Sequence, residues 1–329
     1  RNLCAACRAY DHGGRAMRIL LTGGTGFLGK AVLEALLASD RIERVWVLSR
    51  KLRTHPDPRV VVLVGDLTEM GALREAIVPD LVLHLAGLYQ FSASYSELYL
   101  QNVVATLNLV ERMKEWREQG HVVPIHHASS YAVAFRGDRL GVEDEALLGD
   151  ELPPRDSPYA YTKALAERLV NESGLPARIF RLGALVDDSG QVPEKVDGPY
   201  QFLSLLQTIK KWAPQLAGLA NLPIAADPNG ILPLVPLHVA AQIFARSVLE
   251  LPPPASTEIY GVYRSDSINL KQFTEEALLR CGYQSKPAFF KDTPRWALRA
   301  QQRLTGVPAG VFEFATRPPH LWNPRFVSR

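Results

Sequence analysis

The segment Met17-Arg-Ile-Leu-Leu-Thr-Gly-Gly-Thr-Gly-Phe-Leu-Gly29 decides which fold we expect for this chain. A short apolar run leads straight into a glycine-rich turn, and a run with helical spacing follows. Glycines at positions 23, 26 and 29 permit a tight turn, bring the backbone close to a pyrophosphate, and let the helix pack on the strand. Free N–H groups at the helix N-terminus favour bound phosphate. The segment therefore predicts a dinucleotide-binding strand–turn–helix unit, with an ordinary tight turn as the alternative.

Outward from this segment, short apolar runs alternate with longer amphipathic ones. Strands are expected at residues 18–21, 44–48, 60–64, 81–85, 122–126 and 177–181, and helices at residues 27–38, 68–77, 97–117 and 158–171, then at 239–249, 270–280 and 294–304. The alternation predicts an α/β fold of the Rossmann type, in which a doubly wound parallel sheet carries helices on both faces. The ligand crevice of such a sheet lies at the carboxyl ends of its strands.

The length and composition set the expected domain organisation. The chain has 329 residues, of which 47% are hydrophobic and 22% are charged, and this is the composition of a folded protein. We interpret residues 1–16 as a disordered extension and residues 17–182 as an NADP-binding Rossmann domain. The alternation stops there, so residues 183–329 are expected to form mostly a smaller C-terminal substrate lobe, with some elements returning to the Rossmann sheet.

Several classes of protein are disfavoured by charge, hydropathy and cysteine content. A net charge of +3 is too small to argue for binding to nucleic acid. No uninterrupted apolar run approaches the roughly 20 residues that a transmembrane helix needs. Cys4 and Cys7 have the spacing of metal ligands but lack a second pair, so we predict no metal site. With three cysteines, a reducing cytoplasm is the expected location.

Basic residues follow the second expected strand and bear on the choice of cofactor. Arg50 stands where an NAD-binding protein usually carries an acidic residue for the ribose 2′-hydroxyl. Because a guanidinium binds a 2′-phosphate, we predict a preference for NADP(H) over NAD(H), with a solvated loop charge as the alternative. Asp66 and Leu67, after the third strand, are expected near the adenine, unless Asp66 only forms a turn.

Tyr159-x-x-x-Lys163 is the predicted catalytic pair. Four residues apart on a helix, the two side chains share a face. A free phenol has a pKa of about 10, and a neighbouring ammonium lowers that pKa toward the range in which proton transfer is efficient. Such a pair is also a frequent surface coincidence, so a partner segment is needed.

The partner segment is His126-His-Ala-Ser-Ser-Tyr131, which we expect directly after the fifth strand, at the carboxyl edge of the sheet. There Ser130 can donate a hydrogen bond to a substrate carbonyl oxygen alongside Tyr159, and Ser129 is the alternative. His126 and His127 are interpreted as packing residues because neither has metal-ligand spacing.

Together these residues resemble the extended short-chain dehydrogenase/reductase family, part of the NAD-dependent epimerase/dehydratase superfamily. The resemblance covers nearly all of the chain from Met17 onward. The motifs that carry it are Thr22-Gly-Gly-Thr-Gly-Phe-Leu-Gly29, Gly65-Asp66-Leu67, His84-Leu-Ala-Gly87, Asn102, Ser129-Ser130, Tyr159-x-x-x-Lys163 and Arg181-Leu-Gly183. Within the family the chain is most similar to the thioester-reductase or fatty-acyl-reductase-like branch, on the basis of Leu85-Ala-Gly-Leu-Tyr-Gln-Phe91 and Asp197-Gly-Pro-Tyr-Gln-Phe202.

The resemblance implies roles for individual residues. It implies catalysis by Ser130, Tyr159 and Lys163, with Lys163 also holding the nicotinamide ribose and Asn102 keeping a proton-relay water in place. The implied cofactor contacts are Gly23, Thr25, Gly26, Phe27, Leu28, Gly29, Arg50, Asp66, Leu67, Leu85, Ala86, Gly87, Tyr159 and Lys163.

Three functions fit this sequence. The first is an NAD(P)H-dependent reductase of an aldehyde, ketone or acyl thioester with an apolar chain, either free or carrier-bound, with Tyr159 as proton donor; the uncharged run 212–226 favours it. The second is a nucleotide-sugar epimerase-type enzyme with tightly bound NAD, and the third is a non-catalytic NADP-binding protein. An oligomer is compatible with each of them.

Three arginines share one face of the helix expected at 294–304, namely Arg295, Arg299 and Arg303. They could receive the phosphates of an acyl carrier or an anionic membrane surface, which would be a peripheral contact. The alternative is a packed helix whose arginines lie in water.

Overall fold

The computed structural model describes residues 16–71, 73, 77–90, 93–137, 141–187, 198–263, 267–291, 294, 303, 315–316 and 318–321. The predicted extension lies outside these residues except for Ala16, and the predicted helix 294–304 lies outside them except for Pro294 and Arg303. Within the part of the chain that is described, no helix is long and apolar enough to cross a membrane.

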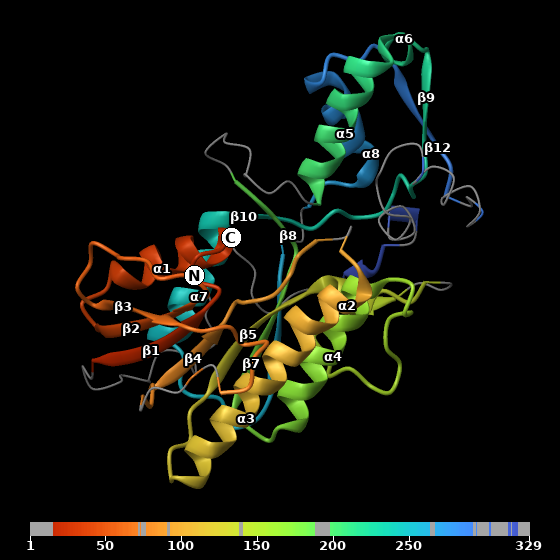
Figure 1. The fold of residues 1–329 in the computed structure, drawn as a ribbon. Coiled ribbons are helices and arrows are strands. Elements are labelled where there is room, and N and C mark those ends of the chain that lie inside the picture. Colours follow the sequence, from red (N-terminus) through yellow and green to blue (C-terminus); the bar gives the residue numbers. More distant parts are fainter. Residues whose placement is uncertain are drawn as a thin grey trace.

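A seven-stranded parallel sheet forms the centre of the molecule (Figure 1). In spatial order its strands are β11 (Glu258–Val262), β7 (Ala177–Leu182), β5 (Ile125–Ser130), β4 (Leu81–His84), β1 (Met17–Thr22), β2 (Ile42–Ser49) and β3 (Val60–Val64). The chain builds outward from β1 first toward β3 and then, starting with β4, toward β11. In a doubly wound sheet, ligands bind outside the carboxyl ends of the strands at such a reversal, which here falls between β1 and β4. The prediction of a doubly wound α/β fold of the Rossmann type is confirmed.

Helices cover both faces of the sheet (Figure 1). One face carries α1 (Phe27–Leu37) and α7 (Leu237–Leu249), and the other carries α3 (Ala105–Glu118) and α4 (Pro158–Glu172). Along β1, Ile19 and Leu21 pack in the first core, while Leu20 packs in the second. Since successive side chains of a strand point to opposite faces, a strand covered on both sides is apolar throughout.

Shorter elements surround the carboxyl edge of the sheet. They are α2 (Tyr95–Leu98), the π-helix η2 (Tyr99–Val104), the 3₁₀-helix η3 (Tyr131–Ala134), and the paired strands β6 (Val142–Glu143) and β13 (His320–Leu321). The segments α2, η2 and α3 follow one another without a break. The expected helix at 97–117 therefore contains a π-helical stretch that residue spacing does not reveal.

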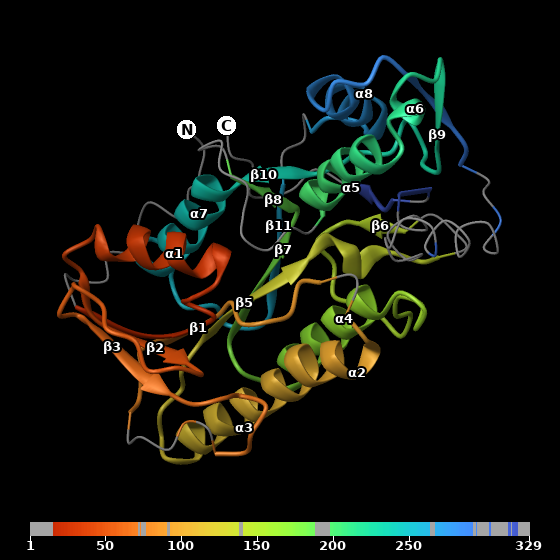
Figure 2. The ribbon, with the colours of Figure 1, turned by 45° about the horizontal axis from the view of Figure 1, so that its top comes forward.

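A smaller lobe stands apart from the sheet (Figure 2). Its elements are α5 (Pro199–Trp212), α6 (Pro214–Ala217), α8 (Leu270–Arg280) and the parallel pair β9 (Asn221–Ile224) and β12 (Lys286–Phe289). Leu206, Leu222, Leu278 and Tyr283 belong to its separate core. A parallel pair, β8 (Ala184–Val186) and β10 (Leu234–Pro236), joins the lobe to the sheet, because β8 follows β7 and β10 precedes α7.

The fifth strand begins and ends later than the sequence predicts. It runs from Ile125 to Ser130 instead of over 122–126. Pro124 has no N–H to donate to the ladder, although its carbonyl oxygen accepts a hydrogen bond from Val82 N at 3.0 Å. As a result Ser129 and Ser130 are the last residues of the strand rather than part of the loop that follows.

The helix expected at 68–77 is wrong for its described residues, because residues 68–71 form turns. The Asp66 carboxylate accepts hydrogen bonds from both the backbone N–H and the hydroxyl of Thr68, each at 2.9 Å. A side chain bonded in this way offers the backbone an alternative to the helix. Residues 72 and 74–76 lie outside the described part of the chain.

We predict that Gly29→Ala destabilises the fold where α1 meets β1. A Cβ at this position would overlap the carbonyl oxygen of Gly23 and lie 2.7 Å from Gly24 Cα, so backbone rather than side chain must move. Overpacking of this kind costs about 1–3 kcal/mol. Urea denaturation should show that loss, whereas the control Gly149→Ala, whose Cβ meets nothing within 4 Å, should stay close to the wild type. Equal midpoints for the two variants would contradict this packing argument.

Candidate active site

The glycine turn packs directly against the segment that follows β4. Gly23 has a φ of 74°, and a Cβ there would lie 2.5 Å from Ala86 N and 2.7 Å from Leu85 C. Only glycine permits both this backbone conformation and this approach. Gly26 N donates to Gly23 O at 2.9 Å and closes the turn. Two segments predicted to bind the cofactor are thereby brought into contact.

The N-terminus of α1 is open to an anion. Gly26 is its N-cap, no side chain caps it, and its first turn has no acidic residue. Thr25, Gly26 and Phe27 are exposed, while Leu28 packs against the core on the α1 face. Because the first N–H groups of a helix lack partners within the helix and carry partial positive charge, they favour a phosphate. The turn and the helix start therefore fit the pyrophosphate of a dinucleotide.

The residues predicted to contact the adenosine half of the cofactor lie just after β2 and β3. Arg50 directly follows β2, is exposed, and makes no side-chain hydrogen bond or ion pair with the described residues. One oxygen of Asp66 holds the turn at Thr68, as the turn-forming alternative proposes. Leu67 is buried, and its carbonyl oxygen accepts from Asn108 Nδ2 at 2.7 Å. This loop is therefore fixed to α3.

The predicted catalytic pair lies in the first turns of α4, with both side chains buried. Tyr159 is 6% exposed and Lys163 is 7% exposed. Lys163 Nζ donates to the carbonyl oxygen of Ala128 in β5 at 2.6 Å. Tyr159 packs with Ala132 and other apolar residues just beyond β5. The helix thus presents both side chains to the carboxyl end of the strand that ends in Ser130.

Burial governs the protonation states around Lys163. It lowers the pKa of Lys163 to about 8, and the negative charge of Glu167 opposes that shift. It lowers the pKa of His84 to about 3, and the charge of Lys163 acts in the same direction. The pKa of His127 also falls well below its ordinary value, chiefly through burial and then through the charges of Lys163 and His84. The two imidazoles are therefore neutral at physiological pH.

The two candidate serines differ in their hydrogen bonds. Ser130 Oγ accepts from Ala132 N at 3.3 Å at the start of η3 and so retains its own proton for a further acceptor. The buried hydroxyl of Ser129 has no hydrogen-bond partner among the described residues. Of the two serines, Ser130 is the one whose hydroxyl oxygen is held in place by a backbone N–H while its proton can go to another acceptor. This suits a group that donates a hydrogen bond to a substrate oxygen.

Asn102 acts as a clamp on the segment after β4. Its Oδ1 accepts from Leu88 N at 2.7 Å, and its Nδ2 donates to Leu88 O at 3.3 Å and to Thr162 Oγ1 at 3.2 Å. Asn102 lies in η2, and a π-helical stretch inside an α-helix is frequent at functional sites. The side-chain amide therefore ties the segment after β4 to α4.

Residues predicted to bind the cofactor and residues predicted to be catalytic meet at Gly87. A Cβ on this residue would lie 3.1 Å from Asn102 Oδ1 and 3.8 Å from Lys163 Nζ. Leu85 and Ala86, which precede it, are the residues that abut the glycine turn. These contacts place the glycine turn, residues 85–87, Asn102 and Lys163 next to one another.

Sequence reasoning missed residues whose partners are far away in the chain. The ring of Tyr89 contacts that of Tyr159 edge-on, with centroids 5.2 Å apart. Thr22 and Thr106 bind the two ring nitrogens of His84. The spacing of Asn102 and Thr106, four residues apart on a helix, was a usable sequence signal. Nothing in the sequence indicated the contact with Tyr89.

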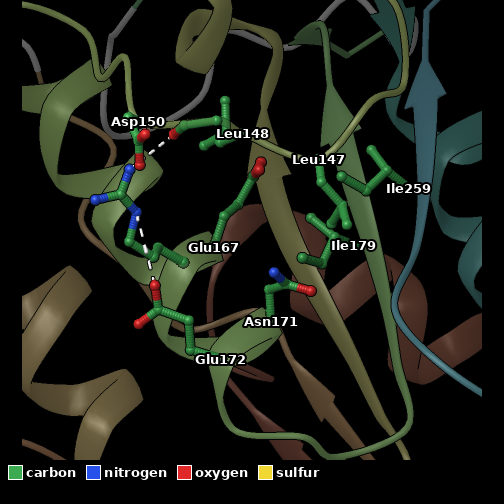
Figure 3. Close-up of a pocket in the computed structure, with 10 residues that line it drawn as sticks. Leu147, Leu148, Asp150, Glu167, Asn171, Glu172, Ile179 and Ile259 are labelled. Carbon is green, nitrogen blue, oxygen red and sulfur yellow. Dashed lines mark hydrogen bonds and ion pairs between the residues drawn. The ribbon is translucent and has the colours of Figure 1, made fainter.

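A pocket of about 160 Å³ lies farther along α4 from the predicted catalytic pair, between α4, β7, β11 and residues 147–150 (Figure 3). None of the predicted site residues lines it. Glu167 extends into this pocket, and its carboxylate pairs with Arg181 at 2.9 Å with both side chains 2% exposed. Breaking such a buried pair is costly, so the pair fixes α4 one turn beyond Lys163.

Comparison with known proteins places the chain in a family. The model of the NAD dependent epimerase/dehydratase family matches residues 19–191, more than half of the chain. The chain belongs to this family. Its members use a nicotinamide dinucleotide, and the chain is accordingly an NAD(P)-dependent oxidoreductase of the short-chain dehydrogenase/reductase type.

Similar curated proteins are large fungal synthetases. Fusarin C synthetase of Gibberella moniliformis is 28% identical over 254 residues, which are 71% of this chain and 6% of the synthetase. A hybrid PKS-NRPS synthetase of Talaromyces variabilis is 29% identical over 276 residues, 80% of this chain and again 6% of the relative. The chain thus spans only a small part of the length of these relatives.

Similar solved structures share the fold. The terminal R domain of the myxalamid PKS-NRPS pathway gives a TM-score of 0.66 at 21% identity, covering 95% of this chain and 82% of that chain. A thiolation-reductase di-domain from an archaeal non-ribosomal peptide synthetase gives 0.63 at 18% identity, covering 92% and 66%. The dTDP-glucose 4,6-dehydratase DesIV from Streptomyces venezuelae gives 0.61 at 23% identity, covering 83% and 84%.

The buried ammonium of Lys163 gives a prediction about stability and pH. Between pH 8 and 10.5 the unfolded chain keeps this proton while the folded chain releases it, so the contribution of Lys163 to stability rises with pH. Relative to Lys163→Met, the wild type should gain roughly 3 kcal/mol in free energy of unfolding across this window. Denaturant titrations of both proteins at several pH values measure it. A difference that does not change with pH would show that the folded ammonium is not penalised.

Proposed function

We propose that this chain is an NADPH-dependent reductase of an aldehyde, ketone or acyl thioester with an apolar chain, and that a carrier-bound acyl thioester is the favoured substrate. The observation that carries the proposal is the junction at Gly87, where the cofactor segment lies beside Asn102 and Lys163. A scaffold that only bound a nucleotide would need no buried lysine, tyrosine and serine at this junction. The coexistence of these features supports catalysis.

The residues divide the chemistry between them. When bound, the cofactor supplies the hydride that reduces the substrate carbonyl carbon. Tyr159 donates its phenolic proton to the carbonyl oxygen, and Ser130 donates a hydrogen bond to the same oxygen. We infer that the ammonium of Lys163, four residues after Tyr159 on the same helix, stabilises the phenolate of Tyr159 and also holds the nicotinamide ribose. For a thioester, this addition gives a hemithioacetal, whose C–S bond then breaks; the hydroxyl proton ends on the departing thiol and the product is an aldehyde.

A carrier-bound thioester is the favoured substrate class because of the relatives. The chain is similar to a short part of hybrid PKS-NRPS synthetases and to a solved thiolation-reductase di-domain. The uncharged run 212–226 in the smaller lobe supports an apolar acyl chain. We therefore propose a carrier protein or domain as the partner, with a peripheral membrane contact and an oligomer as alternatives. The proposed location is the cytoplasm, on the basis of the three cysteines.

The nucleotide-sugar epimerase alternative is distinguished by its cofactor and substrate. Purified protein should oxidise added NADPH with a pantetheine-linked apolar acyl thioester or its aldehyde. Co-purified NAD, no NADPH oxidation with either substrate, and turnover of a nucleotide sugar would contradict the reductase proposal and favour the epimerase. A protein that binds NADPH and turns over none of these substrates would favour the non-catalytic alternative.

We predict that Tyr159→Phe abolishes turnover and leaves the affinity for NADPH largely intact. The substitution removes the proton donor and keeps the ring that packs against Tyr89, so at least about 100-fold should be lost from the chemical step. Tyr161→Phe, two residues along the same helix, is the matched control and should retain activity. Single-turnover NADPH oxidation measures both. Equal rates in Tyr159→Phe and the wild type would remove Tyr159 from the mechanism.

We predict that Arg50→Asp shifts cofactor preference from NADPH toward NADH. Arg50 is exposed at the carboxyl end of β2, free to meet a 2′-phosphate, and a carboxylate there would repel that phosphate. The loss of a charge-assisted hydrogen bond should weaken NADPH binding roughly 10- to 100-fold. Arg44→Asp, near the amino end of the same strand, controls for the change in charge. If titrations with both cofactors give the same ratio in variant and wild type, Arg50 is a solvated loop charge.

A further inference from the structure

A chain of buried hydrogen bonds runs from the glycine turn to η2. It passes through the end of β1, the end of β4 and the start of α3. Thr22 Oγ1 lies 2.7 Å from His84 Nδ1, and His84 Nε2 lies 3.0 Å from Thr106 Oγ1. Thr106 Oγ1 donates to the main-chain carbonyl oxygen of Asn102 at 2.6 Å. All four residues are at most 2% exposed, so no solvent competes for these bonds.

The available protons settle the direction of every bond in this chain. Thr106 has one hydroxyl proton, and it goes to the Asn102 carbonyl, which can only accept. Thr106 Oγ1 must therefore accept a proton from His84 Nε2. The uncharged His84 then has a bare Nδ1, which accepts from the Thr22 hydroxyl. Thr22 Oγ1 in turn accepts from Ala86 N at 3.3 Å, so every donor has one acceptor.

A similar arrangement on the opposite face of the sheet dictates the other tautomer. Ser247 Oγ donates to Phe244 O at 2.7 Å, so it must accept from His126 Nδ1 at 3.0 Å. His126 Nε2 lies 3.3 Å from an Arg178 nitrogen, which can only donate. His126 is thus protonated on Nδ1 and His84 on Nε2. The His126 chain touches none of the predicted site residues and provides an internal control.

We propose, on the basis of the proposed function, that His84 is a positioning residue: in its Nε2–H tautomer it couples the glycine turn to the π-helix that carries Asn102. Thr22 immediately precedes Gly23, so one end of this series of hydrogen bonds is attached to the glycine turn. At the other end the Asn102 amide clamps Leu88 and Thr162, the neighbour of Lys163. A shift of the turn is therefore transmitted to the clamp on α4.

Imidazole nitrogen NMR tests the tautomers without any turnover. Uniformly ¹⁵N-labelled protein should show His84 protonated on Nε2 and His126 protonated on Nδ1, with each resonance assigned by its loss in His84→Asn or His126→Asn. Both rings should keep these states between pH 5 and 8, because burial lowers the pKa of each. An Nδ1–H tautomer for His84, or a His84 ring that becomes charged in this range, would overturn the proposal.

A double-mutant cycle tests the coupling. Thr22→Val and Thr106→Val remove hydroxyls that touch opposite nitrogens of His84. Each should weaken NADPH binding or lower kcat by roughly tenfold, and the double variant should lose much less than the product of the two effects, because His84 loses its fixed orientation once either partner is gone. Repeating the cycle in His84→Asn should remove the non-additivity. Additive effects in the wild-type background would overturn the proposal.

Conservative and matched variants separate positioning from general loss of stability. Thr106→Ser keeps the hydroxyl and should retain NADPH affinity and kcat, whereas Thr106→Val should not. Ser247→Ala removes the corresponding hydroxyl next to His126. We expect it to lower stability about as much as Thr106→Val does, but to leave NADPH affinity and kcat unchanged. If Ser247→Ala reduces NADPH affinity as strongly as Thr106→Val, the effect is structural and the proposal fails. The protein could show the expected tautomers and the expected coupling in NADPH affinity and still have no reductase activity. That result would support the positioning role of His84 and contradict the proposed reductase function.

Discussion

The bond from Lys163 to the Ala128 carbonyl is the interaction on which the arrangement of the site depends. It takes an ammonium out of water and anchors α4 to β5 at the carboxyl end of the sheet. Desolvation disfavours the charged form, and the negative charge of Glu167 only partly offsets that penalty, so the pKa of Lys163 falls to about 8. The group is left protonated at neutral pH but close to titration. The buried ammonium therefore costs stability, and it lies on the same helix as Tyr159, the predicted proton donor, four residues further along.

Two buried polar systems hold α4 around this lysine. On one side, Asn102 links the helix to Leu88 through Thr162, and on the other the Glu167–Arg181 pair fixes the next turn. Both systems contain groups that would be costly if left without partners in the interior, which makes each geometry all-or-none. Such constraints suit a catalytic pair that must keep its orientation whether or not a ligand is bound.

Glycine residues allow backbone segments to approach one another closely at the predicted cofactor site. Gly23 lets the turn reach the segment after β4, and Gly29 lets α1 approach that turn. Any side chain at either position would meet backbone atoms, which cannot rotate away. The open N-terminus of α1 and the Lys163 region are consequently held on one rigid edge, and the smaller lobe, with its own core, stands outside that edge.

The sequence by itself determined the features that depend on local spacing. The alternation of strands and helices predicted the doubly wound sheet, the glycine spacing predicted the turn, and the four-residue spacing placed Tyr159 and Lys163 on one face. Only the tertiary structure decided which carbonyl receives Lys163 and that His84 joins Thr22 to Thr106. The physical reason is distance along the chain. Helical and strand periodicity act over a few residues, whereas partners separated by 22 to 62 residues meet only after strand order and packing are complete.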